Sequence, residues 1–316
     1  MPFVGEILRH RSVSIVGLSK NAGKTECLNY VIKRLPLDYF GVAVTSIGID
    51  GETTDQVTGT AKPEITVREG MFFATSEKHF RQKRPLSELY AVSEEDTALG
   101  RVVTAKALQE GKVLLSGPSS VTSLKRWMHS LDGFGIDLIL IDGALSRLST
   151  ASPAVSEAMV LSTGAAYSAN IRELVNKTAF VVELIGLPLY VGPEPQLRVS
   201  SFSALDAEVL KDHPVVEVEG ALTDRLVTAA KNALAGGELE LVVGDFTRIF
   251  CSQDLYRAFL RRGGRISVRM KSTLLAVCVN PVAPNGIVLD SDTLCRELSA
   301  RIGLPVYDIV KNDYAV

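Results

Sequence analysis

The sequence has few cysteines and no strong excess of charge. Its four cysteines lie far apart and form no Cys-x-x-Cys pair; they are Cys27, Cys251, Cys278 and Cys295. Such spacing argues against a disulfide framework and against a zinc site, so we expect buried structural thiols. The formal net charge of -2 gives no indication of binding to nucleic acid or to an acidic membrane surface.

Long apolar runs are also missing. The sequence contains no stretch of about eighteen uncharged apolar residues, so it predicts no membrane-spanning helix. Residues 1–11 have neither a long apolar run nor a small-residue cleavage site, and we expect no signal peptide. Together with the scarcity of cysteine, these absences favour a reducing, cytoplasmic setting.

Several common catalytic signatures are absent as well. No Gly-x-Ser-x-Gly elbow occurs, and the histidines have no metal-ligand spacing; they are His10, His79, His129 and His213. We therefore expect surface or structural roles for them. The basic segment 77–84, which contains His79, is expected to be a solvated surface segment.

Short apolar runs alternate with helical patterns along the chain. Residues 13–16 predict a buried strand, residues 24–35 a helix with one buried face, and residues 42–45 a second strand. This order is the opening of a parallel α/β sheet. The continuous apolar run at 138–141 predicts a central strand covered on both faces. Two β-prone runs within 99–115 predict a hairpin.

A phosphate-binding loop is predicted between the first strand and the first helix. The run from Gly17 to Thr25 reads Gly-Leu-Ser-Lys-Asn-Ala-Gly-Lys-Thr, although Leu18 stands where the first glycine of the usual spacing would fall. Backbone N–H groups at a helix start wrap phosphate oxygens. The predicted nucleotide-binding residues are Ser19, Lys20, Asn21, Ala22, Gly23, Lys24, Thr25 and Glu26.

Charged and hydroxyl side chains near this loop suggest magnesium-dependent chemistry. Lys24 can bridge the β- and γ-phosphates, while the Thr25 hydroxyl and Asp142 can hold Mg²⁺. Asp142 follows the apolar strand at 138–141, as a Walker B aspartate does. Asp50, Glu52 and Asp55 lie in a polar loop after the second strand, where one of them could be a metal ligand or could orient water. Solvated loop carboxylates are an equal alternative for these three.

The choice of base rests on weaker signals. The nearest match to the guanine-specific Asn-Lys-x-Asp pattern begins at Asn176; it lacks the aspartate and lies inside a predicted helix. ATP is therefore favoured over GTP. Asn280 and Pro281 follow the predicted strand 274–279, where an asparagine could contact the base, although an Asn-Pro turn is the stronger interpretation.

We expect two domains. Length and a hydrophobic content of 46% allow a second core, and the strand–helix alternation restarts after a proline-bearing link at 192–201. The prediction is an α/β P-loop NTPase fold with a mostly parallel sheet over residues 1–190. A second, smaller α/β domain over residues 191–316 would contact a partner or substrate.

The loop from Lys20 to Thr25 is similar to that of MobB-type molybdopterin accessory proteins. The chain resembles the wider class that also includes dethiobiotin synthetase and several metallochaperone NTPases, and Lys62-Pro63 is similar to the Lys-Pro of dethiobiotin synthetases. The signature lysine of that class would align with Ser19, which puts its use across a dimer in doubt. Nucleotide sites of this class often form at dimer interfaces, so a homodimer is an additional expectation.

A second resemblance spans most of the chain. Residues 46–52, 142–147 and 279–281 look like segments of a lysine aminomutase reactivase subunit. Such proteins serve a mutase that depends on cobalamin and pyridoxal phosphate. The resemblance implies ATP-driven release of damaged cobalamin from a client enzyme.

Three functions follow from these features, in decreasing order. The first is an ATPase that uses Mg-ATP to remodel or reactivate a partner enzyme, with Lys24, Asp50 and Glu52 as catalytic residues. The second is an ATP-dependent ligase or kinase of the dethiobiotin synthetase type. The third is a nucleotide-binding regulatory module without hydrolysis. A nucleotide and a protein client are the expected partners, and nucleic acid and membranes are not.

Overall fold

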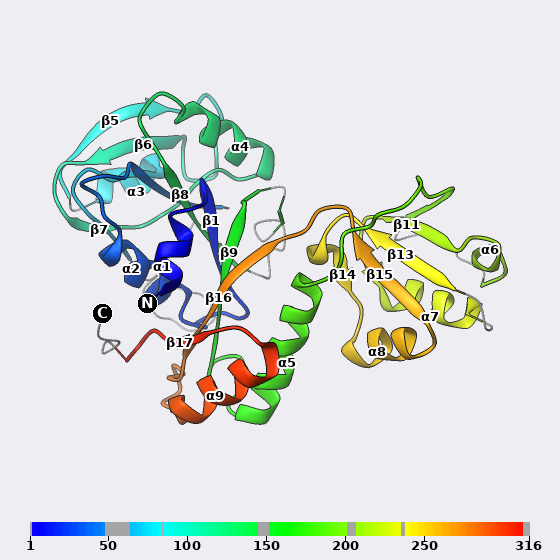
Figure 1. Cartoon of the computed structure of the whole chain (residues 1–316). Helices are drawn as coiled ribbons and strands as arrows, with labels where there is room; N and C mark the ends of the chain where they lie inside the picture. Colours follow the sequence, from blue (N-terminus) through cyan, green and yellow to red (C-terminus); the bar gives the residue numbers. More distant parts are fainter. Residues whose placement is uncertain are drawn as a thin grey trace. The chain divides into compact units, whose positions relative to one another are not determined.

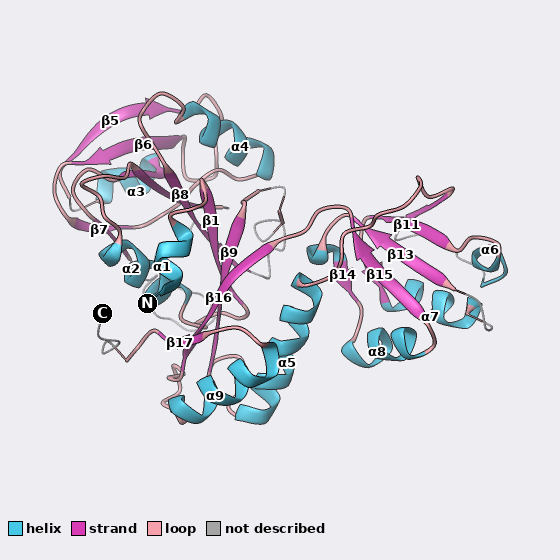
Figure 2. Cartoon of the chain, in the orientation of Figure 1, coloured by secondary structure: helices cyan, strands magenta, loops and turns pink. Residues whose placement is uncertain are grey.

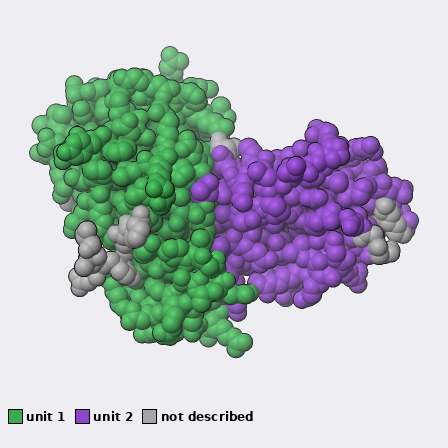
Figure 3. Space-filling view, in the orientation of Figure 1, with its two compact units in different colours: residues 1–151, 155–175, 274–316 green, residues 152–154, 176–273 purple. Residues whose placement is uncertain are grey.

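The chain divides into two compact units. The computed structural model describes residues 2–47, 64–83, 85–144, 152–153, 155–200, 207–234 and 238–311. Unit 1 comprises Met1–Ala151, Val155–Val175 and Leu274–Val316, and unit 2 comprises Ser152–Ala154 and Asn176–Thr273 (Figure 3). The sequence suggested one boundary near residue 190. In the structure, by contrast, the chain returns to unit 1 after residue 273.

Unit 1 is organised around a nine-stranded sheet with the order β17-β16-β9-β1-β8-β2-β4-β6-β5 (Figure 1). Its strands are β1 (Ser12–Gly17), β2 (Val42–Ser46), β4 (Phe72–Ser76), β5 (Ser87–Val92), β6 (Val102–Ala107), β8 (Leu138–Ala144), β9 (Ala158–Gly164), β16 (Thr273–Asn280) and β17 (Val306–Asp308). β1 pairs in parallel with β8 and β9, and β2 pairs in parallel with β8 and β4. β6 pairs antiparallel with β4 and β5. The predicted α/β class with a mostly parallel sheet is therefore confirmed.

The central strands are apolar because helices cover both faces of the sheet. Leu138 and Leu140 of β8 belong to a core that also contains residues of helices α1 and α2, while Ile139 and Ile141 belong to a second core with residues of α4. Alternate side chains of a strand point to opposite faces, so the part of β8 that lies between the two cores is apolar at every position. The continuous run at 138–141 thus has the burial that the sequence predicted.

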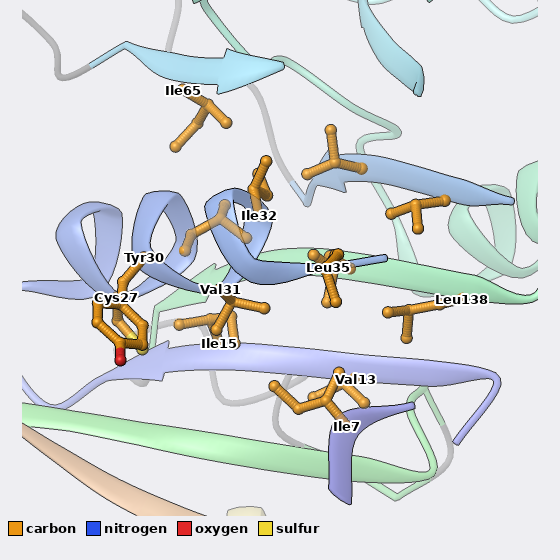
Figure 4. Packing of buried hydrophobic residues seen from close by; sticks show 14 of the residues in the cluster. Ile7, Val13, Ile15, Cys27, Tyr30, Val31, Ile32, Leu35, Ile65 and Leu138 are labelled. Carbon is orange, nitrogen blue, oxygen red and sulfur yellow. The ribbon is translucent and has the colours of Figure 1, made fainter. Parts of the chain in front are cut away.

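The helices of unit 1 are α1 (Pro2–Ile7), α2 (Lys24–Arg34), α3 (Glu77–Gln82), α4 (Val121–Ser130), α5 (Ile171–Ile185) and α9 (Ser291–Ile302), of which α5 continues into unit 2. Figure 4 shows Cys27 and Val31 of α2, and Leu35 directly after it, facing the strands, with Ile15 of β1 opposite Val31. This contact fixes the start of α2 relative to the end of β1. No helix in the described part of the chain is both long and apolar enough to cross a membrane.

One local expectation was wrong, and a second was correct except at one residue, His79. The predicted hairpin within 99–115 does not form, because β6 uses both of its edges for β4 and β5. The second run becomes β7 (Gly111–Val113), which pairs antiparallel with β3 (Ile65–Val67). The segment expected to be a solvated surface contains helix α3, which buries His79.

Unit 2 is a smaller α/β unit. Its four parallel strands run in sequence order, namely β10 (Leu197–Ser200), β11 (Val215–Glu219), β13 (Leu239–Val243) and β15 (Gly264–Val268). Figure 2 shows α6 (Ala207–Lys211), α7 (Asp224–Ala233) and α8 (Gln253–Arg261) beside them. The short elements β12 (Leu222–Thr223), η2 (Phe246–Arg248) and β14 (Ile249–Phe250) complete the unit.

Charged side chains pair along one part of the sheet of unit 2. The guanidinium of Arg269 donates two hydrogen bonds of 3.0 Å to the Glu217 carboxylate, and Arg198 lies 3.3 Å from the same carboxylate. The hydrogen bonds from Arg269 are the largest cause that lowers the pKa of Glu217. Glu217 therefore stays ionised and keeps this ladder of charges intact at neutral pH.

Removal of Ile15 tests the contact between β1 and α2. Ile15→Ala removes three carbon atoms from a fully buried position, and we expect the free energy of unfolding to fall by about 2–5 kcal/mol. Tyr39→Ala is the control, because Tyr39 is 85% exposed and its loss should cost less than about 0.5 kcal/mol. Urea denaturation followed by circular dichroism measures both. Equal effects of the two substitutions would contradict the assigned packing.

Candidate phosphate-binding site

The loop between β1 and α2 has an unusual backbone. Gly23 has φ 86° and ψ 13°, in the left-handed region. Asn21, with φ 61°, is the single non-glycine residue of positive φ in the described part of the chain. The Leu18 N–H donates to the Ser162 carbonyl at 2.9 Å, and the Ala22 N–H donates to the Ser19 carbonyl at 3.3 Å. Left-handed residues in a turn before a helix are typical of backbone nests that bind anions.

Gly23 lies close to the last strands of the sheet. A Cβ atom at this position would lie 2.6 Å from the Asn280 Cβ and 3.1 Å from the Ile309 Cδ1. The loop therefore depends on glycine for two reasons, its positive φ and the lack of space. Asn280 accepts a hydrogen bond from the Val282 N–H at 3.0 Å, so it forms the turn that the sequence favoured. The same side chain also borders the loop.

Lys24 and Asp142, both predicted from the sequence, are brought together. The Lys24 Nζ lies 2.9 Å from the Asp142 Oδ1, with the two side chains 25% and 16% exposed. Among the residues that the structure describes, Oδ1 has no partner in a regular hydrogen bond, so the contact is an ion pair whose angle departs from hydrogen-bond geometry. Parallel pairing of β1 with β8 places Ile15 beside Asp142 in register. The two charges neutralise each other in a partly buried position.

Polar side chains lie at or near the carboxyl ends of four strands of the sheet, on the face that carries α2. They are Ser46 of β2, Asp142 of β8, Ser162 of β9 and Asn280 of β16. Residues two positions earlier in the same strands belong to the apolar core under α2, namely Val44, Leu140, Val160 and Cys278. Because side chains two apart share a face, the four polar residues form one row at the carboxyl edge. Ligands of open α/β sheets bind outside this edge.

The row of four polar residues could have been predicted from the sequence. Asp142, Ser162 and Asn280 are each the first polar residue after an apolar run, and Ser46 follows one with Thr45 between, which is a recognisable signal. Asp142 and Asn280 were considered on this basis. Ser162 was missed, although its hydroxyl is fully buried and makes no hydrogen bond within the described residues.

The remaining predicted residues have different surroundings. Ala22 and Gly23 are buried, Ser19, Lys24 and Thr25 are half-buried, and Lys20, Asn21 and Glu26 are exposed. All of them lie on the loop or on the first turn of α2. Asp50, Glu52 and Asp55 lie outside the described residues, as do Lys62 and Pro63.

The donor set near the loop fits Mg²⁺ better than a transition metal. Among the residues that the structure describes, no three His, Cys, Asp or Glu side chains gather to hold a metal ion. Mg²⁺ does not need such a group, because it keeps several waters and binds one or two carboxylates together with phosphate oxygens. Thr25 and Asp142 can supply the protein's share of such a shell.

The cysteines have a structural role. Cys27 of α2 and Cys278 of β16 are both buried, and a hydrogen bond with Cys27, followed by burial, raises the pKa of Cys278 well above its usual value. Burial raises the pKa of Cys251 and of Cys295 to about 11. These three thiols are therefore protonated at neutral pH and poor nucleophiles.

No protein-family model matches the sequence, and no curated protein matches it either. The resemblances to MobB-type proteins, to dethiobiotin synthetase and to the reactivase subunit therefore stay predictions. What the site can do has to be argued from its own geometry.

Gly23→Ala tests the close approach of the loop to Asn280. Gly263 is a matched control, because its φ is 92° and a Cβ there meets nothing within 4 Å. Strain alone should make Gly263→Ala cost about 1–2 kcal/mol. Gly23→Ala should cost more and lower Tm further in differential scanning calorimetry, since Asn280 must also move. An equal loss in the two variants would contradict the contact.

Proposed function

We propose that the chain is a magnesium-dependent ATPase whose phosphate site is formed by residues 17–25. The ion pair between Lys24 and Asp142 is the observation that carries this proposal. It joins a cation at a helix start to a carboxylate on the adjacent parallel strand, beside a loop of left-handed residues. Triphosphate and Mg²⁺ need these two charges next to each other.

Each group has a role in the proposed reaction. Lys24 moves from Asp142 to the β- and γ-phosphate oxygens when the nucleotide binds. Asp142 and Thr25 would hold Mg²⁺, which would supply positive charge to the phosphates. Asp50 and Glu52, which follow β2 in the sequence, are proposed to help orient the water.

The surroundings of the loop give the nucleotide a direction across the sheet. Asn280 and Ile309 border Gly23 on the side of β16 and β17, whereas Asp142 lies on the other side of β1. We place the base near Asn280 and the γ-phosphate near Asp142. ATP is the proposed nucleotide.

Coupling to a partner enzyme is the proposed use of hydrolysis. Unit 2 is a compact α/β unit of its own, which supports a contact role separate from the phosphate site. Reactivation of a cobalamin-dependent aminomutase is the client reaction that the resemblance implies. A ligase or kinase of the dethiobiotin synthetase type would instead show turnover dependent on a small metabolite, and a regulatory module would bind without turnover.

Substitution of Lys24 tests its proposed role in binding the phosphates. Lys24→Ala removes the cation that faces the phosphates, and we expect ATP affinity to fall roughly 10- to 100-fold. Lys33→Ala, an exposed lysine of the same helix, should leave affinity unchanged. Isothermal titration with Mg-ATP measures both variants. Unchanged binding by Lys24→Ala would overturn the proposed phosphate site.

Asp142→Asn should change the affinity for ATP differently with and without magnesium. Loss of the carboxylate weakens Mg-ATP binding, because the metal loses a ligand. It also releases Lys24 from its ion pair, so the affinity for metal-free ATP should stay equal or rise. Titration in Mg²⁺ and in EDTA compares the two. A similar loss in both buffers would show that Asp142 does not act through the metal.

Asn280→Ala tests the proposed direction of the nucleotide. If Asn280 contacts the base, the substitution should weaken ATP binding several-fold and leave the affinity for tripolyphosphate unchanged, because tripolyphosphate has no base. Competition titrations with the two ligands give the comparison. An equal loss for both would mean that Asn280 acts only by supporting the loop at Gly23.

A further inference from the structure

Buried polar side chains gather beside Asp142, outside the phosphate loop. They come from the ends of β2 and β4, from α3 and from the segment after β7, and each is at most 8% exposed. We call them the serine–histidine cluster: Thr45, Ser46, Thr75, Ser76, His79 and Ser116. Burial of a polar group is costly unless it makes hydrogen bonds, so such a group needs a structural or functional cause.

The hydrogen bonds of the cluster hold one short segment, residues 114–117. The Thr75 hydroxyl donates to the Leu114 carbonyl at 2.6 Å. The Ser116 hydroxyl is hydrogen-bonded to the His79 Nδ1, and the Gly117 N–H donates to the Ser46 Oγ at 3.2 Å. Three residues of the segment are thus fixed to β4, α3 and β2.

Gly117 is pressed against the end of β2. A Cβ atom there would lie 1.9 Å from the Ser46 carbonyl oxygen and 2.3 Å from the Thr45 Oγ1. Only glycine allows this approach. Ser46 is in turn the register partner of Asp142, and the Ile47 N–H donates to the Asp142 carbonyl at 3.4 Å. The segment is therefore one strand away from the proposed metal ligand.

The position of this segment matters for the proposed hydrolysis of ATP, and the inference rests on that proposed function. With the base near β16 and the γ-phosphate near β8, the phosphate chain points toward the next strand in the sheet, β2. Phosphoryl transfer needs the attacking oxygen and the leaving oxygen roughly in line. The place in line with the γ-phosphate is then over the end of β2, where Ser46 and Gly117 meet.

We propose that the serine–histidine cluster positions the attacking water. The Ser46 Oγ accepts the Gly117 N–H, and in this proposal its hydroxyl donates to the water. His79 and Ser116 are positioning residues that hold Gly117 in place. The water oxygen forms a bond to the γ-phosphorus, and the bond from that phosphorus to the β–γ bridging oxygen breaks. Its electron pair leaves with ADP, inorganic phosphate forms, and the proton passes to solvent.

Gly117→Ala and Gly41→Ala form a matched pair for the test. A Cβ at Gly41 would lie 1.8 Å from the Gly135 carbonyl oxygen, a collision as severe as that at Gly117, but before β2 begins rather than at its end. Three quantities are measured on the full chain: affinity for Mg-ATP, single-turnover hydrolysis, and uptake of fluoroaluminate by the Mg-ADP complex. Fluoroaluminate mimics the γ-phosphoryl group with its attacking water.

The expected result separates rate from affinity. Gly117→Ala should lower hydrolysis and fluoroaluminate uptake by at least about tenfold, with the affinity for Mg-ATP changed less than about threefold. Gly41→Ala should lower Tm by a similar amount and leave hydrolysis and affinity unchanged. A parallel fall of rate and affinity, or equal rate losses in both variants, would show that Gly117 serves stability alone.

His79 provides a second test that does not depend on a steric collision. His79→Leu removes the hydrogen bond to Ser116, whereas His79→Asn keeps a polar atom near the Nδ1 position. The rate should fall in the first variant and partly recover in the second, with Mg-ADP affinity unchanged in both. No difference between the two variants would contradict a positioning role for His79.

The wild-type chain distinguishes this inference from the proposed function. If it binds Mg-ATP but neither hydrolyses it nor takes up fluoroaluminate, the assigned water position is wrong and nucleotide binding stands. If it binds no nucleotide, the proposed function fails first.

Discussion

The parallel pairing of β1 with β8 is the constraint on which the candidate site depends. It sets Ile15 beside Asp142 in register, and the tight loop then returns Lys24 to within 2.9 Å of that carboxylate. Packing of α2 on the same strands, with Val31 over Ile15 (Figure 4), fixes the direction in which Lys24 leaves the loop. Without the register the two charges would each be partly buried and unpaired, which is costly. The apolar core and the ion pair therefore support the same geometry.

The sheet gives this site two unlike sides. Toward β16 the loop meets Asn280 and Ile309, which crowd Gly23. Toward β2 it meets Asp142, and beyond that strand a dense set of buried hydroxyl groups around Gly117. Both positions need glycine, but their neighbours differ. A Cβ at Gly23 would collide with the Asn280 side chain, and a Cβ at Gly117 would collide with the Ser46 backbone carbonyl.

Local pattern was enough to predict part of the structure. The apolar run before Asp142, the helix after Gly23 and the α/β class follow from periodicity and composition, because each depends on neighbours in sequence. The return of β16 and β17 to the first sheet could not be predicted in that way, since strand order depends on contacts between distant segments. The hairpin within 99–115 failed for the same reason: β4 and β5 occupy both edges of β6. His79 looked isolated because its partner, Ser116, is far away in sequence.

The chain passes from unit 2 directly into β16, a strand that ends beside the candidate site. Unit 2 ends at Thr273, and β16 begins at the same residue and ends at Asn280. Asn280, the last residue of β16, borders Gly23. β16 lies between β9 and β17, so the place of Asn280 beside the loop depends on the register of β16 with both neighbours.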